Sequence, residues 1–244
     1  MPYIYLETRA GKTILVEKHY SWRYNRKGIR RGENRNRTKE SQERVNLRHS
    51  IRKLTLLLNE NFGYGDYHLT LTYAPAQRPD GPEEAKADLE KFLRKLRGCY
   101  KKSGKELKYI AVTEYGKKGA LHHHIVMNHG TSTKEIQDIW KKGWCDFHPM
   151  DKTGEYSHLA SYLLKKKNYW KEQGGKGRYF RRSKNLVMPA TEKHIIKTRD
   201  GYYEKPRPRK GYYVDGDTVQ TGHTKDGWPY MSYILVEENG RRGP

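Results

Sequence analysis

The 244-residue sequence predicts a fold of mixed helices and strands, because segments with helical periodicity and short β-type segments both occur along it. Residues 39–61 carry a stripe of apolar side chains at helical spacing: Leu47, Ile51, Leu54 and Leu58. Residues 67–73 (YHLTLTY) are rich in β-branched and aromatic residues, which favour a strand. Residues 110–128 hold two apolar runs joined by a turn of glycine and lysine, which is typical of a β-hairpin.

The N-terminal segment predicts two short strands in residues 1–20, around a turn at residues 9–12. A basic stretch follows, with eight Lys or Arg residues between Arg23 and Lys39. This stretch fits either a solvated loop or a basic arm that lies on DNA phosphates. In the second interpretation the phosphate-binding candidates are Arg23, Arg26, Lys27, Arg30 and Arg31.

Two further helices have clear start signals. Pro82 suits the first turn of a helix whose apolar stripe consists of Leu89, Phe92, Leu93 and Leu96. Ser132 and Glu135 form a capping-box pattern, which predicts the start of a short helix. Residues 143–148 then predict another strand, and residues 212–236 predict a small β segment at the C-terminus.

The hairpin of residues 110–128 carries a candidate metal site. Side chains alternate across a strand, so His122 and His124 share one face and His123 points to the other. Glu114 ends the preceding strand, and strand pairing can bring its carboxylate beside the two imidazoles. Two nitrogens and one oxygen suit Mg²⁺, Mn²⁺ or another divalent ion that polarises a phosphoryl oxygen. The alternative is a solvated run of histidines without a ligand.

Residues 155–168 predict a helix with a candidate nucleophile, Tyr162. Lys165 and Lys166 follow at i+3 and i+4, where their charges would favour the phenolate and the charge on a phosphate under attack. Taken alone, the segment also fits an ordinary amphipathic helix with a core tyrosine. The combination with the hairpin favours the catalytic interpretation.

The composition predicts a polyanionic partner. The formal net charge is +22, and 20 tyrosines accompany a hydrophobic fraction of only 34%. Basic charge with abundant aromatic rings suits single-stranded nucleic acid, although a generic basic protein, such as a ribosome-associated one, has similar composition. Residues 168–182 form a basic and aromatic stretch, which is either a flexible loop or a surface on which single-stranded bases stack. The DNA-binding candidates in and next to this stretch are Lys167, Trp170, Arg178, Arg181 and Arg182.

Cysteine usage and hydropathy exclude several classes. Only two cysteines are present, which predicts no disulfide framework and no cysteine-based metal site, and a reducing cytoplasm as the location. We find no apolar run of about 18 residues that would span a membrane and no secretory signal.

The order of these elements resembles the HUH endonuclease superfamily, named for two histidines that flank one residue. A YHLTLTY strand, an E-x7-HHH hairpin and a Y-x-x-K helix follow one another. Within the superfamily, the chain looks like the rolling-circle replication-associated (Rep) proteins of phages and bacterial mobile elements, of the gene II type. The resemblance spans roughly Glu17 to Leu235 and includes the stretches RVNLRHSIRKLTLLLNENFGYGDYHLTLTY, VTEYGKKGALHHHIV and SKNLVMPATEKHI.

The resemblance implies a palm-like α+β domain whose central antiparallel sheet is flanked by helices. We expect this domain over residues 1–200, and a C-terminal β appendage over residues 201–244. The resemblance also implies that His122, His124 and Glu114 bind the metal, that Tyr162 is the nucleophile and that Lys165 assists it. The sequence departs from the family pattern at two positions: His158 stands where a second tyrosine is common, and His123 where a hydrophobic residue is usual.

The implied function is initiation of rolling-circle replication. The protein would nick single-stranded DNA, or a melted hairpin at an origin, through a 5′-phosphotyrosine intermediate, and would later rejoin the strand. No Walker A sequence is present, so host helicase and polymerase would act as partners in the bacterial cytoplasm. Three alternatives stay open: a relaxase or single-strand transposase with the same chemistry, an origin or promoter binder that does not cut, and a nuclease that uses water.

Overall fold

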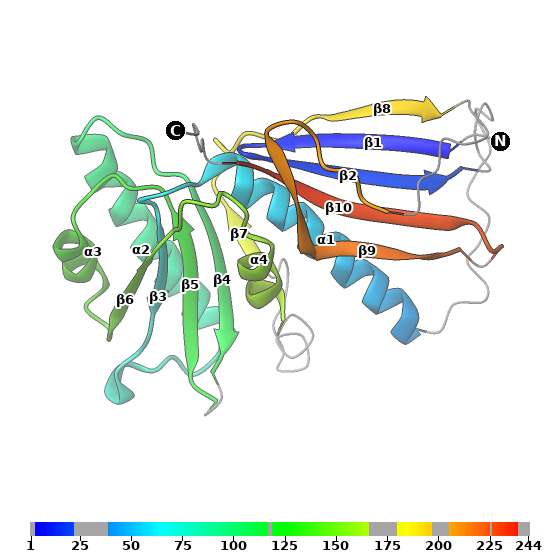
Figure 1. The fold of residues 1–244 in the computed structure, drawn as a ribbon. Coiled ribbons are helices and arrows are strands. Elements are labelled where there is room, and N and C mark those ends of the chain that lie inside the picture. Colours follow the sequence, from blue (N-terminus) through cyan, green and yellow to red (C-terminus); the bar gives the residue numbers. More distant parts are fainter. Residues whose placement is uncertain are drawn as a thin grey trace. The chain divides into compact units, whose positions relative to one another are not determined.

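The computed structural model describes residues 3–21, 39–116, 119–165, 180–196, 205–224 and 226–238. These residues form four α-helices, one short 3-10 helix and two five-stranded antiparallel sheets (Figure 1). The predicted α+β class is therefore confirmed. The chain groups into two compact units: Met1–Glu60 with Thr153–Ala160 and Met188–Pro244, and Asn61–Lys152 with Ser161–Val187.

The sheet of the first unit has the strand order β8-β1-β2-β10-β9. Its strands are β1 (Tyr3–Ala10), β2 (Thr13–Tyr20), β8 (Thr191–Ile196), β9 (Tyr212–His223) and β10 (Pro229–Glu237). The predicted N-terminal hairpin is present, and Gly11 closes its turn with φ of 54°. A Cβ atom at Gly11 would lie 2.1 Å from the carbonyl oxygen of Asn59, so both the conformation and the space require glycine.

Helix α1 (Lys39–Asn61) packs on one face of this sheet and has the bounds that the sequence predicts. Its Leu56 packs against Leu15, Ile234 and Val236. The opposite face has its own buried cluster: Ile14, Val16, Met231, Tyr233 and Leu235. The predicted C-terminal β segment is present as β9 and β10, and β10 pairs with β2. The predicted domain limits, residues 1–200 and 201–244, stay a prediction.

The sheet of the second unit has the order β6-β3-β5-β4-β7, with β5 in the centre. Its strands are β3 (Tyr67–Leu71), β4 (Tyr109–Tyr115), β5 (Leu121–Met127), β6 (Cys145–Pro149) and β7 (Phe180–Arg182). The 3-10 turn η1 (Pro75–Gln77) follows β3. Strand β5 is buried along almost its whole length, as expected for the centre of a covered sheet.

Helices α2 (Pro82–Lys102) and α3 (Thr133–Trp140) pack together and cover one face of this second sheet. Pro82 occupies the first turn of α2, and Ser132 and Glu135 form the predicted capping box of α3. The buried ring of Trp140 meets Phe92 of α2 at 5.7 Å and His123 of β5 at 5.6 Å, both between ring centroids. The face of β5 that carries His123 therefore points into the core.

Helix α4 (Ser157–Leu164) is shorter than the predicted helix over residues 155–168. Its last four residues, Ser161 to Leu164, belong to the second unit, and Leu163 and Leu164 are buried. No helix within the described part of the chain is long and apolar enough to cross a membrane.

Candidate metal and nucleophile site

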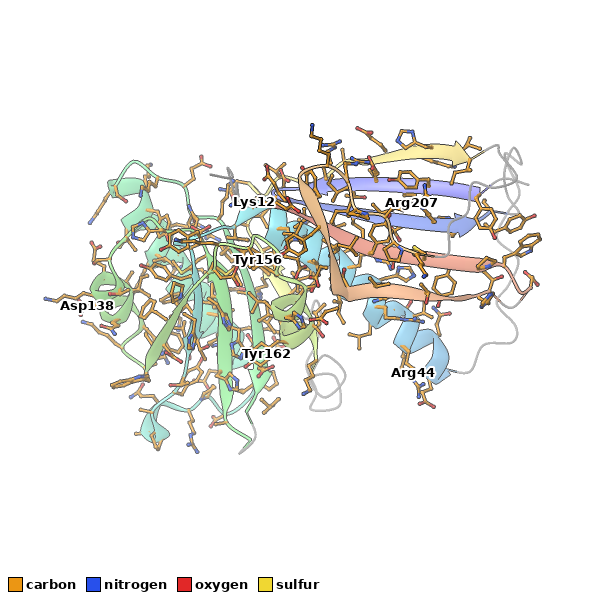
Figure 2. All side chains as sticks on the ribbon, in the orientation of Figure 1. Lys12, Arg44, Asp138, Tyr156, Tyr162 and Arg207 are labelled. Atoms are coloured by element: carbon orange, nitrogen blue, oxygen red, sulfur yellow. The ribbon has the colours of Figure 1, made fainter. Side chains whose placement is uncertain are left out.

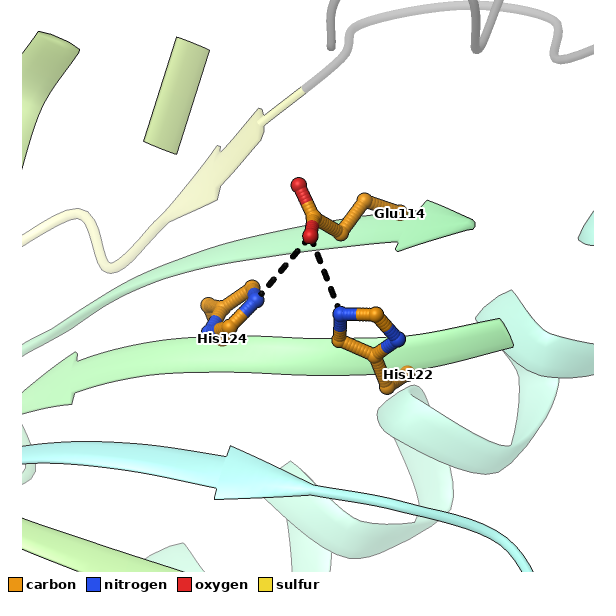
Figure 3. A group of neighbouring side chains, drawn as sticks. All are labelled: Glu114, His122 and His124. Carbon is orange, nitrogen blue, oxygen red and sulfur yellow. Dashed lines mark hydrogen bonds and ion pairs between the residues drawn. The ribbon is translucent and has the colours of Figure 1, made fainter. Parts of the chain in front are cut away.

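The β4–β5 hairpin brings the predicted ligand residues together. Its register pairs Glu114 with His122 and Val112 with His124, so the three polar side chains lie on one face of the sheet. Glu114 Oε1 lies 2.9 Å from His122 Nε2 and 3.3 Å from His124 Nε2 (Figure 3). One carboxylate oxygen is thus flanked by the Nε2 atoms of both histidines.

The Glu114 carboxyl is ionised in this environment. Its side chain is only 3% exposed, and burial opposes ionisation. Hydrogen bonds to His122 and His124 outweigh burial and hold the pKa of Glu114 well below its usual range. A buried carboxylate with two facing imidazole nitrogens is a suitable ligand set for a divalent ion.

His123 lies on the opposite face, as the strand alternation predicts. It is completely buried, and burial lowers its pKa to about 3. Its Nδ1 atom lies 2.8 Å from Thr113 Oγ1, and its Nε2 atom lies 2.9 Å from the hydroxyl oxygen of Tyr73. Two hydroxyl partners therefore satisfy a histidine at a position that is usually hydrophobic in the resembled family.

Two residues of β3 complete the surroundings of His124. His68 Nε2 and Thr70 Oγ1 each lie 3.2 Å from His124 Nδ1. The His68 ring stacks on the His124 ring, with centroids 5.3 Å apart, and burial lowers the pKa of His68 to about 4. Both ring nitrogens of His124 thus have polar neighbours: Nε2 faces Glu114, and Nδ1 faces β3.

Tyr162 of α4, which is labelled in Figure 2, contacts His124 of the cluster. Its hydroxyl oxygen is 3.5 Å from His124 Nε2, and its ring meets the His124 ring edge-on at 5.2 Å. The residue is 48% exposed. Burial and the Glu114 charge raise the pKa of Tyr162, which leaves the phenol protonated in the absence of a cation.

One of the two expected helpers of Tyr162, Lys165, lies within the described residues. Helix α4 ends at Leu164, so Lys165 belongs to the turn after the helix, where its N–H donates to the Tyr162 carbonyl oxygen at 3.3 Å. Lys165 therefore lies just outside the helix that carries Tyr162, whereas the resemblance implied that both residues are on one helix. Lys166 lies outside the described residues. His158, at the place of the second tyrosine, is exposed and pairs with Asp217 at 3.5 Å in the first unit.

Most of the predicted DNA-binding residues lie outside the described part of the chain, namely Arg23, Arg26, Lys27, Arg30, Arg31, Lys167, Trp170 and Arg178. Arg181 and Arg182 are described, on β7. Arg182 pairs in register with Ile110, which places it on the face of Glu114. Arg181 points to the other face and forms an ion pair with Glu90 of α2. Their role in DNA binding stays a prediction.

The donor atoms of Glu114, His122 and His124 all lie within 4.8 Å of one another, which fits a single small ion. A second group with this spacing in the described residues consists of Glu7, Glu192 and His194. There, Glu7 Oε1 already accepts hydrogen bonds from Tyr5 and Arg209. A cation would lie beside the Arg209 guanidinium, so this second group is a poor metal site.

The alternation in residues 67–73 predicts that His68, Thr70 and Thr72 share a face that could line the site, but it does not identify His68 as a neighbour of His124. The missing information was the pairing of β3 with β5, which sets Thr70 opposite His124. An apolar-polar alternation with three polar residues on one face was the only available signal.

An antiparallel sheet that presents two histidines, a carboxylate and a neighbouring tyrosine agrees with the resemblance to HUH-type replication proteins. Residues 66–167 match the family model described as Replication-associated protein ORF2/G2P, which confirms the resemblance to phage gene II-like Rep proteins over this segment. The matched residues include β3, the β4–β5 hairpin and α4. Comparison with curated proteins and with solved structures gave no match.

Proposed function

We propose that this chain is a rolling-circle replication initiator that nicks and rejoins one DNA strand at Tyr162. The observation that carries the proposal is the position of Tyr162, a half-exposed residue whose hydroxyl oxygen lies 3.5 Å from a nitrogen of the Glu114, His122 and His124 cluster. A nucleophile and a ligand set for a divalent ion are thus within reach of one phosphate.

Glu114, His122 and His124 would hold Mg²⁺ or Mn²⁺. Such an ion supplies Lewis-acid chemistry, because it withdraws charge from a non-bridging oxygen of the scissile phosphate. The Glu114 carboxylate is one cause of the raised pKa of Tyr162. Compensation of the Glu114 charge removes that cause, and the phenol then ionises more readily.

The Tyr162 oxygen loses its proton and attacks the phosphorus atom in line. The bond from phosphorus to the 3′ oxygen breaks, the 3′ oxygen takes up a proton, and the 5′ phosphate stays on Tyr162. No bond energy is lost to water, so a later 3′-hydroxyl can reverse the step and rejoin the strand. The free 3′ end then primes DNA synthesis by a host polymerase, with a host helicase as the second partner.

Single-stranded DNA as substrate is supported by the charge of +22, and replication is supported by the description of the matched family. The test is a nicking assay with labelled single-stranded oligonucleotides that tile the surrounding replicon, with Mn²⁺ or with EDTA. We expect Mn²⁺-dependent cleavage with the label carried to the size of the protein. His122→Ala should abolish cleavage and keep DNA binding.

The other outcomes would overturn the proposal in distinct ways. Cleavage without transfer of label to the protein indicates a hydrolytic nuclease. Tight binding without any cleavage across the replicon indicates a binder of origins or promoters. Transfer at a site outside a replication origin indicates a relaxase or a single-strand transposase with the same chemistry.

A further inference from the structure

The loop between α3 and β6 carries a strongly exposed aromatic side chain. Trp144 is 76% exposed, which is unusual for the largest apolar side chain. Its backbone is nevertheless fixed: the Trp144 N–H donates to Thr72 Oγ1 at 3.2 Å, and its carbonyl oxygen accepts from the Thr72 N–H at 2.9 Å. The ring is thus exposed on a rigid base rather than on a loose loop.

The rest of the loop is equally constrained. The Lys142 carbonyl oxygen accepts from the Ala74 N–H at 2.8 Å. A Cβ atom at Gly143 would lie 2.3 Å from the Thr72 carbonyl oxygen, so only glycine allows this close approach. The loop is therefore held against the end of β3 at three consecutive residues, Lys142, Gly143 and Trp144.

Lys141 has a backbone conformation that lysine disfavours. Its φ of 48° is the one positive value found for a non-glycine residue in the described ranges. The position is the C-cap of α3, where glycine or asparagine is the usual residue. Residues with strained backbone conformations cluster at functional sites. The strain at Lys141 therefore suggests that its charge has a functional role.

The loop borders a cavity of about 490 Å³. The cavity is lined by Thr72, Gln77, Lys141, Lys142 and Trp144, among others. Lys142 pairs with the buried Asp88 of α2 at 2.9 Å, so its ammonium group is already neutralised, whereas Lys141 is exposed. A hollow with an exposed indole and an exposed lysine suits a nucleotide, whose base stacks on the ring and whose phosphate meets the Lys141 ammonium group.

The sheet register connects this hollow with the candidate metal site. Strand β3 pairs Leu71 with His123 of β5 and with Cys145 of β6. Thr72 and Trp144 lie one residue beyond the paired ranges of β3 and β6, and the Thr72 N–H donates to the Trp144 carbonyl oxygen at 2.9 Å. Because β3 separates β6 from β5, Trp144 lies about two strand spacings, or roughly 10 Å, from the strand that carries His122.

We infer that Trp144, with Lys141, is a subsite for single-stranded DNA that stacks a base a short distance along the strand from the phosphate at the cluster. The inference rests on the proposed function for the nature of the substrate. The loop between α3 and β6 was not among the DNA-binding residues that the sequence predicts.

The test measures binding of a fluorescent oligo-dT of about 15 nucleotides to the full chain in EDTA, so that no cleavage occurs. Trp144→Ala should weaken binding roughly 5- to 100-fold, because stacking of one base contributes that much. Trp144→Phe should restore most of the affinity, and Trp144→Leu should not, because leucine is apolar but has no aromatic face.

Lys141 offers a test in which stability and binding move in opposite directions. Lys141→Gly and Lys141→Asn should raise the midpoint of thermal unfolding, because both residues tolerate positive φ. Both should weaken oligo-dT binding and reduce its salt dependence, because one phosphate contact is lost. Lys95→Ala is the matched charge control, since Lys95 is exposed on α2, which covers the other face of the sheet.

Wild-type affinity in Trp144→Ala, or equal losses in Lys141→Gly and Lys95→Ala, would overturn the subsite and leave the proposed nicking function in place. Weak binding by Trp144→Ala in a protein that never forms a covalent adduct would support the subsite and contradict the proposed function. No binding of oligo-dT by the wild-type chain would overturn both.

Discussion

Adjacent histidines on β5 have different surroundings, because successive side chains of a strand point to opposite faces of the sheet. His122 faces Glu114, and its side chain is 17% exposed. His123 is buried between Thr113 and Tyr73. Single substitutions of His122 and His123 should therefore differ in effect: the first should impair metal binding, and the second should impair folding stability.

His123→Ala is expected to destabilise the protein by about 3 kcal/mol or more, because it leaves a cavity and removes a hydrogen-bond partner of the buried residues Thr113 and Tyr73. His122→Ala should cost only about 1–2 kcal/mol, since His124 remains beside Glu114. Urea unfolding measures both values, and Mn²⁺ titration measures binding. Retained Mn²⁺ binding in His122→Ala would contradict the ligand assignment.

His68 is expected to hold His124 in the orientation that directs Nε2 to the ion. If His124 Nε2 binds metal, its Nδ1 carries the proton and needs an acceptor, which His68 Nε2 and Thr70 Oγ1 supply. His68→Leu should weaken Mn²⁺ binding about 10- to 100-fold, and His68→Gln should restore part of it.

The control for His68 is His148→Ala on the neighbouring strand. His148 is exposed and pairs with Asp146 at 2.9 Å, so its loss should leave Mn²⁺ affinity unchanged. Equal Mn²⁺ affinity in His68→Leu and the wild type would show that His68 only packs against His124.

At the scale of elements, Arg209 ties the segment before β9 to strand β1. Its guanidinium pairs with Glu7, whose side chain is 7% exposed. Arg209→Met should destabilise the protein by about 1–2 kcal/mol, because a buried carboxylate loses its charged partner and keeps only the Tyr5 hydroxyl, while the arginine itself is partly exposed. Glu192→Gln, at an exposed neighbour of Glu7 on β8, is the control and should have little effect.

The Arg209 effect should depend on pH. Burial opposes ionisation of Glu7, but hydrogen bonds to Tyr5 and Arg209 outweigh it, so its pKa lies below the usual value. The stabilisation is thus fully present above the unfolded-state pKa of about 4.3 and is lost as the pH falls through the folded-state pKa. Thermal unfolding of the wild type and Arg209→Met should converge at low pH; a constant difference would contradict this assignment.

Elements with a strong local signal were predicted with accurate bounds. Helix α1 has both predicted ends because its apolar stripe repeats over many turns, and α3 starts at its capping box. The helix around Tyr162 ends earlier than predicted, since the basic residues after Leu164 continue the helical propensity without an apolar stripe to pack.

The site could be predicted only where its contacts are local. Glu114, His122 and His124 lie on one hairpin, so alternation and a short turn were enough to bring them together. His68 and the loop with Trp144 depend on pairing between strands that are distant in sequence, which no local pattern specifies. The presence of two separate sheets depends on the same long-range pairing.

At the scale of the whole molecule, the net charge of +22 should dominate the binding of nucleic acid. We expect affinity for single-stranded DNA to fall steeply with salt, by a slope of about 0.7 per phosphate contact on logarithmic axes. Fluorescence anisotropy from low to physiological salt measures this slope. A flat response would contradict binding through phosphates.

The central claim is that Tyr162 becomes covalently attached to DNA. The most direct measurement is peptide mass spectrometry of the protein after reaction with Mn²⁺ and replicon single-stranded DNA, followed by nuclease trimming. The account predicts a 5′-phosphonucleotide on the peptide that contains Tyr162, and its absence in Tyr162→Phe and in EDTA. An adduct on another tyrosine, or cleaved DNA with every tyrosine unmodified, would contradict it.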